Sequence, residues 1–434
     1  MGLRGAVRYR SHRWPDNVLA RKKSNRGMGK VVGPTGAPRL VSCGRGPVAV
    51  ARSPLRSAAV TLLAASWLVA CHRDRDRDRE QEHSSTPTAT VFDGPAPPIA
   101  EISARGTVAP LPRTKVSVEA SAMGTRLDFV AFTSAQVDEA RTRAVIDRAV
   151  AEIRRLEALM TTWRDDSEIA HINRNAGKAP VKVGVETARV IDESLWISEK
   201  SGGVFDITFE AMHGLWRFDQ DVDPHPPRAE EVAERRKLID YRHIVRDKNE
   251  QTVFLDKAGV KISLGGIAKG FAIDRAAAVL IAEGVQDFLA QAGGDLFVHG
   301  RKPDGSPWIA GVRDPRGEAG TYFAEMPVTD HAFSTAGDYE RSYIVGGRRY
   351  HHIIDPRSGY PATASRSVTI WAKDALTADA LDDAVFILGP KQGLELVESI
   401  DDAGAIIVDA DNRVWISRRL EGKVRVERPP TDGV

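Results

Sequence analysis

The sequence predicts an α+β fold with a largely antiparallel sheet and packed helices. Strand-like segments follow one another at hairpin spacing, long amphipathic segments interrupt them, and strands do not alternate regularly with helices. The chain has 434 residues, 42% apolar and 28% charged, so it can bury a sizeable core. With only 2 Cys, it is not a disulfide scaffold.

The apolar periodicity predicts helices over residues 137–160, 186–200 and 269–283, and another near 378–388. Gly202 and Gly203 are expected to end the second helix, and Gly284 the third. Strands are expected over residues 115–133 with a break at Met123-Gly124, and over 243–245, 252–255, 260–264, 295–298, 308–312, 342–345 and 367–372.

The charge is distributed unevenly along the chain. Residues 1–70 contain thirteen Lys or Arg and one acid, a net +12, so the remainder carries −10 of the total +2. Binding to nucleic acid requires many Lys and Arg to neutralise phosphates. The negative body therefore predicts no nucleic-acid partner.

Residues 58–70 are an uninterrupted apolar and small-residue run that follows Arg52 and Arg56. A membrane span needs roughly 20 residues, so this run is too short, and its layout is typical of a secretory signal. Its end, LVAC, resembles a bacterial lipobox, which implies cleavage before Cys71 and lipidation of Cys71. The alternative is a buried apolar helix that ends in an inert cysteine.

Residues 72–110 alternate charges and then become rich in Pro and Thr, a composition that cannot bury enough surface to fold. We therefore expect a signal segment over 1–70, a lipidated cysteine and disordered tether over 71–110, and one folded domain over 111–434. This layout predicts a protein of the bacterial cell envelope, lipid-anchored to a membrane and facing the periplasm.

The segment SLGGIAKG, residues 263–270, follows an expected strand and opens an expected helix. Glycines and free N–H groups at a helix start favour an anion, although a tight structural turn explains them equally well. The helix dipole contributes only about 0.3–1 kcal/mol, so Lys269 or a metal would supply most of the attraction.

Asp379, Asp382 and Asp383 stand at positions i, i+3 and i+4, and therefore on one side of a helix. Convergent carboxylates suit Mg²⁺ or another hard cation. The alternative is a solvated acidic face near a helix start, where the dipole favours negative charge.

His352 precedes a turn rich in Pro and Gly, and histidine is the side chain best suited to accept a proton near neutral pH. A structural histidine is the alternative. Polar or glycine-rich turns are also expected at 122–125, 201–206, 292–295 and 334–339. Together these segments predict one large phosphate-bearing ligand held by loops.

In order, these segments resemble the ApbE family, the FAD:protein FMN transferases, from about residue 117 to 420. The matching motifs are SAMGT, LMTTWRDDSEI, SGGVFDIT with LWRF, LGGIAKGFAID, QAGGDL, WIAGVRDP, STAGDYE, YHHIIDPRSGYPA and TADALDDAVFILG. The resemblance implies a T-fold-like, Mg²⁺-dependent enzyme that joins FMN from FAD to a threonine hydroxyl through a phosphoester and releases AMP. It also implies an acceptor flavoprotein with an Asp-Gly-x-Thr-like motif.

The resemblance also assigns residues by position. It implies FAD contacts from Met123, Trp163, Val204, Phe205, Asp206, Ser263, Lys269 and Ile353, metal ligands from the Gly266 carbonyl, Asp379, Asp382 and Asp383, and His352 as the base. This chain has Asp383 where the family usually has Thr, and Ser263 where it usually has Asp, which we interpret as a compensated rearrangement. Hydrolysis of FAD to FMN and AMP, and FAD binding without catalysis, are the alternative functions.

Overall fold

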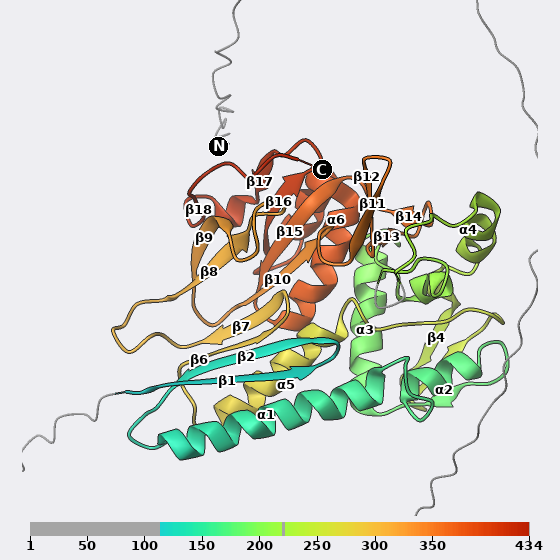
Figure 1. Ribbon diagram of the computed structural model, residues 1–434. Helices are drawn as coiled ribbons and strands as arrows, with labels where there is room; N and C mark the ends of the chain where they lie inside the picture. The colour runs from blue at the N-terminus through green and yellow to red at the C-terminus, as the bar shows by residue number, and fades with distance from the viewer. Residues whose placement is uncertain (1–112, 219–221, 434) are drawn as a thin grey trace, which may run out of the picture. The chain divides into compact units, whose positions relative to one another are not determined.

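The computed structural model describes residues 113–218 and 222–433 (Figure 1). Its largest sheet has eight strands in the order β1-β2-β6-β7-β10-β15-β16-β17, and each neighbouring pair is antiparallel. These strands are β1 Lys115–Ala122, β2 Thr125–Phe132, β6 Phe288–Ala292, β7 Asp295–His299, β10 Ala332–Gly337, β15 Ser365–Ala372, β16 Gly404–Asp409 and β17 Val414–Ile416. The predicted α+β fold with a largely antiparallel sheet is confirmed.

Four smaller sheets accompany the large one. They are β3-β5-β4 (Val181–Lys182, Thr252–Leu255, Ile244–Asp247), β18-β9-β8 (Arg425–Val426, Tyr322–Val328, Trp308–Arg313), β11-β12 (Ser342–Val345, Arg348–His351) and β13-β14 (Ile354–Asp355, Tyr360–Pro361). The α-helices are α1 Glu139–Met160, α2 Glu168–Arg174, α3 Val185–Lys200, α4 Ala229–Arg236, α5 Ala268–Ala282 and α6 Ala375–Glu398. Three 3₁₀ segments are η1 Ile207–Met212, η2 Tyr241–His243 and η3 Arg418–Leu420.

Helix α1 illustrates how the local sequence sets an element. The Asp138 side chain accepts a hydrogen bond from Arg141 N and caps the helix start. The buried residues recur at helical spacing: Val145, Ile146, Ala149, Val150, Ile153, Leu156 and Met160. This face belongs to the main hydrophobic core.

The large sheet has a core on each face. Helices α1, α5 and α6 contact its strands on one side and enclose the main core with them (Figure 1). On the other side, β8 and β9 pack against the sheet around Phe323, Trp371 and Ile406. Because side chains of β2 alternate, Leu127 and Phe129 enter the first core and Val130 the second.

The four predicted helices are present with shifted ends. Gly202 and Gly203 follow α3 with φ of 67° and 83°, and Gly284 follows α5 with φ of 84°, as the predicted helix ends require. Helix α6 is longer than predicted. Its backbone is kinked at Gly389, where φ is 72°, and a second helical segment follows the kink. The short helices α2 and α4 were not predicted.

The strand predicted over residues 260–264 is wrong. Asn173 substitutes for a neighbouring strand: its Oδ1 accepts from Ile262 N at 2.8 Å and its Nδ2 donates to Ile262 O at 2.9 Å. Ser263 N donates to Ile207 O at 3.0 Å. Side-chain and loop partners thus satisfy this extended segment without a ladder.

The predicted boundary between tether and domain at residues 110 and 111 lies just before the described residues, and the predicted signal, Cys71 and tether lie outside them. Among the helices described, none combines the length and the apolar character that crossing a membrane requires.

Candidate active site

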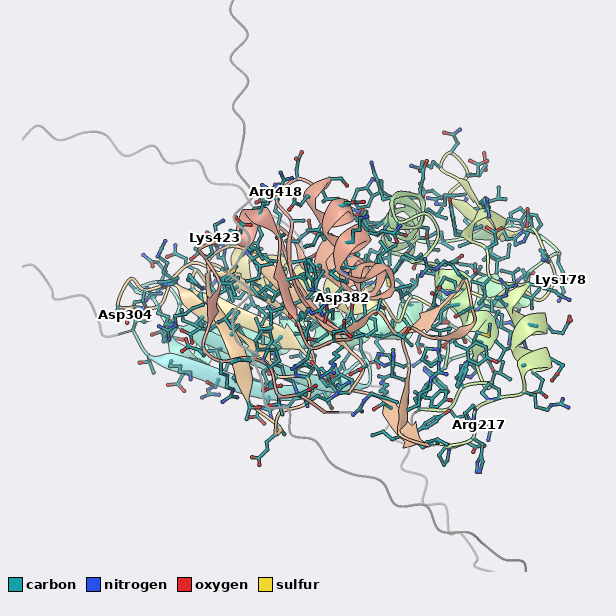
Figure 2. The ribbon with its side chains drawn as sticks, turned by 90° about the horizontal axis from the view of Figure 1, so that it is seen from above. Lys178, Arg217, Asp304, Asp382, Arg418 and Lys423 are labelled. Carbon is teal, nitrogen blue, oxygen red and sulfur yellow. The ribbon has the colours of Figure 1, made fainter. Side chains whose placement is uncertain are left out.

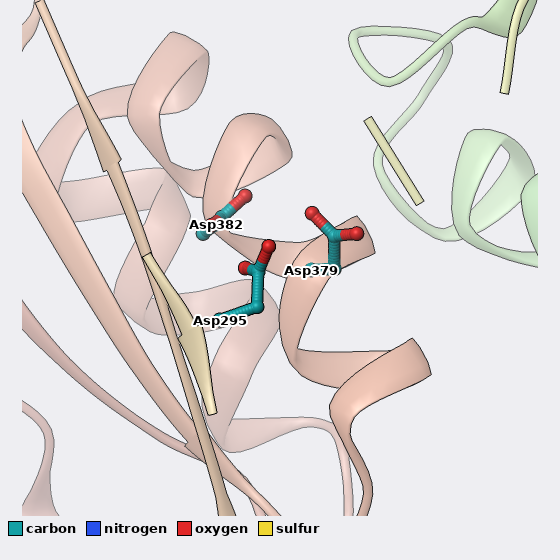
Figure 3. Close-up of side chains that lie close together, drawn as sticks. All are labelled: Asp295, Asp379 and Asp382. Carbon is teal, nitrogen blue, oxygen red and sulfur yellow. The ribbon is translucent and has the colours of Figure 1, made fainter. Parts of the chain in front are cut away.

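Three buried carboxylates form the centre of the site. Asp379 and Asp382 project from α6, and Asp295 stands at the start of β7 beside them (Figure 3). One oxygen from each lies within 4.8 Å of the others. In Figure 2, Asp382 lies inside the molecule, whereas Lys178 and Arg418 lie at its rim. The sequence predicts a turn at residues 292–295 but does not predict Asp295 as a metal ligand.

Lys269 and the start of α5 hold Asp379. Its Oδ1 accepts from Lys269 Nζ at 2.8 Å and its Oδ2 accepts from Gly270 N at 2.8 Å. Lys269 Nζ also lies 3.0 Å from Asp295 Oδ2. A Cβ on Gly270 would lie 2.1 Å from Ala375 O, so only glycine lets α5 and α6 approach this closely.

Ser334 on β10 joins the other two carboxylates. Its Oγ lies 2.5 Å from Asp382 Oδ2 and also contacts Asp295 Oδ1. A hydroxyl has one proton to donate, so it cannot satisfy both carboxylates at once. The predicted turn over residues 334–339 is wrong for its first four residues, because residues 334–337 belong to β10.

Burial and mutual repulsion make these carboxylates costly to ionise. Burial raises the pKa of Asp379 to about 6, with a contribution from Asp295, and it raises the pKa of Asp382 well above its ordinary value. Burial beside Asp379 likewise raises the pKa of Asp383 to about 7. Although burial alone would lower it, the charges of Asp295, Asp379 and Asp382 raise the pKa of Lys269. The cluster therefore favours an additional cation.

Asp383 lies beside the segment of residues 263–267 that precedes α5, which we call the glycine loop. A Cβ on Gly266 would lie 2.8 Å from Asp383 Oδ2 and 3.7 Å from Phe205 Cε2. Ser263 Oγ accepts from Gly265 N at 3.3 Å within the same loop. Gly266 and Asp383, both predicted as metal ligands, thus lie next to each other.

His352 has a fixed backbone and an unused ring nitrogen. Its N donates to Arg341 O at 3.1 Å, and its buried Nδ1 has no hydrogen-bond partner among the described residues. Burial lowers the pKa of His352 to about 3, assisted by His351 and by the charges of Arg341 and Lys269. The imidazole is therefore neutral near pH 7, and its lowered pKa makes it a weak base in these surroundings.

The hairpin turn with Met123 and Gly124, where φ is 53° and 68°, lies beside the turn between β6 and β7. A Cβ on Gly293 would lie 2.7 Å from Thr125 Oγ1, and one on Gly124 would lie 3.9 Å from the Arg341 guanidinium. Met123 thus lies at the same end of the strands of the large sheet as Asp295.

The other predicted FAD contacts have different surroundings. Trp163 is 78% exposed and meets His213 edge to face at a centroid distance of 5.4 Å, while Val204 and Ile353 are buried. The Asp206 carboxylate accepts from Thr208 N, Thr208 Oγ1 and Tyr241 N at 2.6–2.8 Å, so these contacts stabilise η1. The structure brings Phe205 to the glycine loop, but no contact in the described residues joins Trp163 to the carboxylates.

Comparisons with known proteins identify the family to which this chain belongs. The ApbE family model matches residues 123–407. The chain belongs to the ApbE family. The FAD:protein FMN transferase of Treponema pallidum is 34% identical over 303 residues, covering 66% of this chain and 83% of that protein. The Escherichia coli K12 protein of the same name is 28% identical over 289 residues, covering 65% and 82%.

Solved ApbE structures share the fold. The Thermotoga maritima ApbE protein matches with a TM-score of 0.65 and 32% identity, covering 72% of this chain and 100% of that one. The flavin transferase ApbE of Vibrio cholerae matches with a TM-score of 0.62 and 25% identity, covering 71% and 99%.

Proposed function

We propose that this chain transfers FMN from FAD to a threonine hydroxyl of an acceptor flavoprotein through a phosphoester bond, with Mg²⁺ bound and AMP released. The flavin transferase names of its ApbE relatives support flavin transfer. The observation that carries the finer proposal is the juxtaposition of the α6 carboxylates with Lys269 and the glycine loop.

The donor set fits Mg²⁺. Carboxylate oxygens from Asp295, Asp379 and Asp382 converge, and Asp383 adds another beside Gly266. Oxygen ligands are those that Mg²⁺ prefers, and each carboxylate oxygen keeps a second lone pair for a metal. Their convergence assigns Asp295, Asp379 and Asp382 as residues that would hold the ion, and the resemblance to the ApbE family adds Asp383 and Gly266 O. When bound, the ion would neutralise charge on the diphosphate.

The chain's own residues would position the reactants. Lys269, which Asp379 and Asp295 hold in place, would present positive charge to the diphosphate of FAD. Met123, partly buried at the hairpin turn, would offer apolar surface for the flavin, and the buried Phe205 packs beside the loop. Phosphoryl transfer requires mainly such positioning and electrostatic stabilisation.

In the reaction, the threonine oxygen forms a bond to the phosphorus on the riboflavin side, and the bond from that phosphorus to the oxygen of AMP breaks. His352 accepts the threonine proton at a ring nitrogen, and Nδ1 is the one without a partner in the described part of the chain. A diphosphate beside Lys269 and Arg341 would offset the charges that lower the pKa of His352 and make it a stronger base.

The test is product analysis with purified protein, FAD, Mg²⁺ and a synthetic peptide that contains Asp-Gly-Ser-Thr. We expect the peptide to gain one FMN, with one AMP released per modified peptide. A matched peptide with Ala in place of Thr should gain nothing. Free FMN and AMP without peptide modification would instead identify a hydrolase, and intact FAD would identify a binding protein.

We also propose that Cys71 carries a lipid that anchors the protein to a bacterial envelope membrane, with the body facing the periplasm. The proposal rests on the apolar run over residues 58–70 and on the LVAC sequence that ends it. Metabolic labelling with palmitate should mark the wild type and spare Cys71→Ser. Equal labelling of both would reject the anchor.

A further inference from the structure

His351 is the residue next to the proposed base, and its own side chain is directed into the protein. It is the last residue of β12 and is 3% exposed. It was not among the predicted site residues, because two adjacent histidines give no indication of which one is buried. The proposed mechanism assigns it no role.

Both ring nitrogens of His351 are engaged with backbone. Nε2 lies 2.8 Å from Ala362 O, and Ile353 N donates to Nδ1 at 3.3 Å. A carbonyl only accepts, so Nε2 carries the proton, and Nδ1 must keep its lone pair to accept from Ile353. These contacts require a neutral ring, in agreement with burial, which lowers the pKa of His351.

These hydrogen bonds fix the backbone on both sides of His352. Ile353 N is held by the His351 ring and Ile353 O accepts from Ala362 N at 3.0 Å, while His352 N donates to Arg341 O at 3.1 Å. The peptide groups that flank His352 therefore have one arrangement, which sets the direction of its side chain.

The same ring contacts the helix that carries the metal ligands. His351 meets Phe386 of α6 edge to face, with a centroid distance of 5.5 Å and an interplanar angle of 73°. Phe386 follows Asp382 by four positions and Asp383 by three, so the three residues lie on neighbouring turns of one helix side. His351 thus spans from the acidic helix to the backbone of the proposed base.

We infer that His351 is a positioning residue that holds His352 at a fixed place relative to the carboxylates of α6, through its hydrogen bonds to Ile353 and Ala362 and its contact with Phe386. This inference rests on the proposed function for its kinetic consequence. Its structural consequence, a displaced segment 352–353 when the hydrogen bonds are removed, does not depend on that function.

The main variant is His351→Phe, which keeps an aromatic ring against Phe386 and removes both hydrogen bonds. We expect kcat for FMN transfer to fall by about 10²-fold, since a displacement of about 1 Å costs that much, while KM for FAD remains near the wild-type value. His351→Gln restores an amide donor and acceptor and should recover part of kcat. If His351→Phe does not fold, His351→Asn, whose amide is too short to reach Ala362 O, replaces it.

The matched control is His331→Phe. His331 likewise contacts an aromatic ring, stacking on Trp371 at a centroid distance of 4.1 Å, and its Nδ1 contacts Thr329 O at 2.8 Å, but Trp371 belongs to the second core. We expect its kcat to match the wild type even if its stability falls. An unchanged kcat in His351→Phe, or an equal loss in His331→Phe, would overturn the inference.

A crystal structure of His351→Phe separates this inference from the proposed function. We expect residues 352–353 to shift while α6 remains in place. An unshifted segment would overturn the positioning role. Absence of FMN transfer by the wild type would instead refute the proposed function, and the crystal structure would still decide the role of His351.

Discussion

Because α5 and α6 approach closely at Gly270, a Gly270→Ala substitution should change the stability of the protein in opposite directions through helix propensity and through packing. Gly270→Ala improves helix propensity by about 1 kcal/mol, so a helix without this contact would become more stable. In the structure the new Cβ would lie 2.1 Å from Ala375 O and 2.8 Å from Asp379 Cβ, and real Cβ contacts essentially never fall below 3.0 Å. The two helices must therefore separate by about 1 Å.

That separation has two costs. Overpacking costs about 1–3 kcal/mol. Stretching the 2.8 Å bond from Gly270 N to the Asp379 carboxylate costs about 1.5–3 kcal/mol. After the propensity gain, we expect Gly270→Ala to lower the free energy of unfolding by about 1.5–5 kcal/mol and to weaken Mg²⁺-dependent transfer, because Asp379 moves.

Urea denaturation measures the first effect, and titration of the transfer rate with Mg²⁺ measures the second. Gly265→Ala is the matched stability control, because its Cβ would meet only Ser263 Oγ, at 3.5 Å. We expect its unfolding free energy to lie within about 0.5 kcal/mol of the wild type. A Gly270→Ala protein as stable as the wild type would refute the reasoning.

Three further changes test the surroundings of the site. Ser334→Ala removes the hydroxyl between Asp382 and Asp295, whose hydrogen bonding orients these carboxylates. A loss of about 1.4 kcal/mol raises the Mg²⁺ concentration for half-maximal transfer by about tenfold. An unchanged concentration contradicts the prediction. Lys269→Met leaves the carboxylates without their ammonium, so Mg²⁺ should raise the Tm of the variant more than that of the wild type; equal increments contradict it. Burial raises the pKa of Asp274 to about 7 from 3.8, so the folded state binds more protons than the unfolded state and the free energy of unfolding falls as pH rises from about 4 to 7. Asp274→Asn should flatten that fall when urea denaturation is repeated across this pH range. An unchanged pH dependence contradicts the prediction.

The sequence predicted the elements whose residues repeat a local pattern. The apolar spacing in α1 and the glycines after α3 depend only on neighbouring residues, and both predictions are confirmed. The positions of Asp379, Asp382 and Asp383 on one side of α6 follow from helix geometry alone, whereas the group of carboxylates that the fold brings together joins Asp379 and Asp382 with Asp295.

The remaining features depend on contacts distant in sequence. Asp295 joins the carboxylates because β7 starts beside α6, and Ser334 lies between them because β10 pairs with β7. Asn173 replaces a strand partner for Ile262 across 89 residues. No local pattern encodes such pairs, so their roles emerged only from the fold.

The most direct test of the central claim is an anomalous diffraction map of crystals soaked with Mn²⁺ and FAD, since Mn²⁺ takes the same oxygen ligands as Mg²⁺. The account predicts a peak within about 2.0–2.5 Å of Asp379 and Gly266 O and beside the diphosphate, with His352 directed toward the riboflavin-side phosphorus. A peak remote from α6, or a diphosphate bound away from the glycine loop, would contradict it.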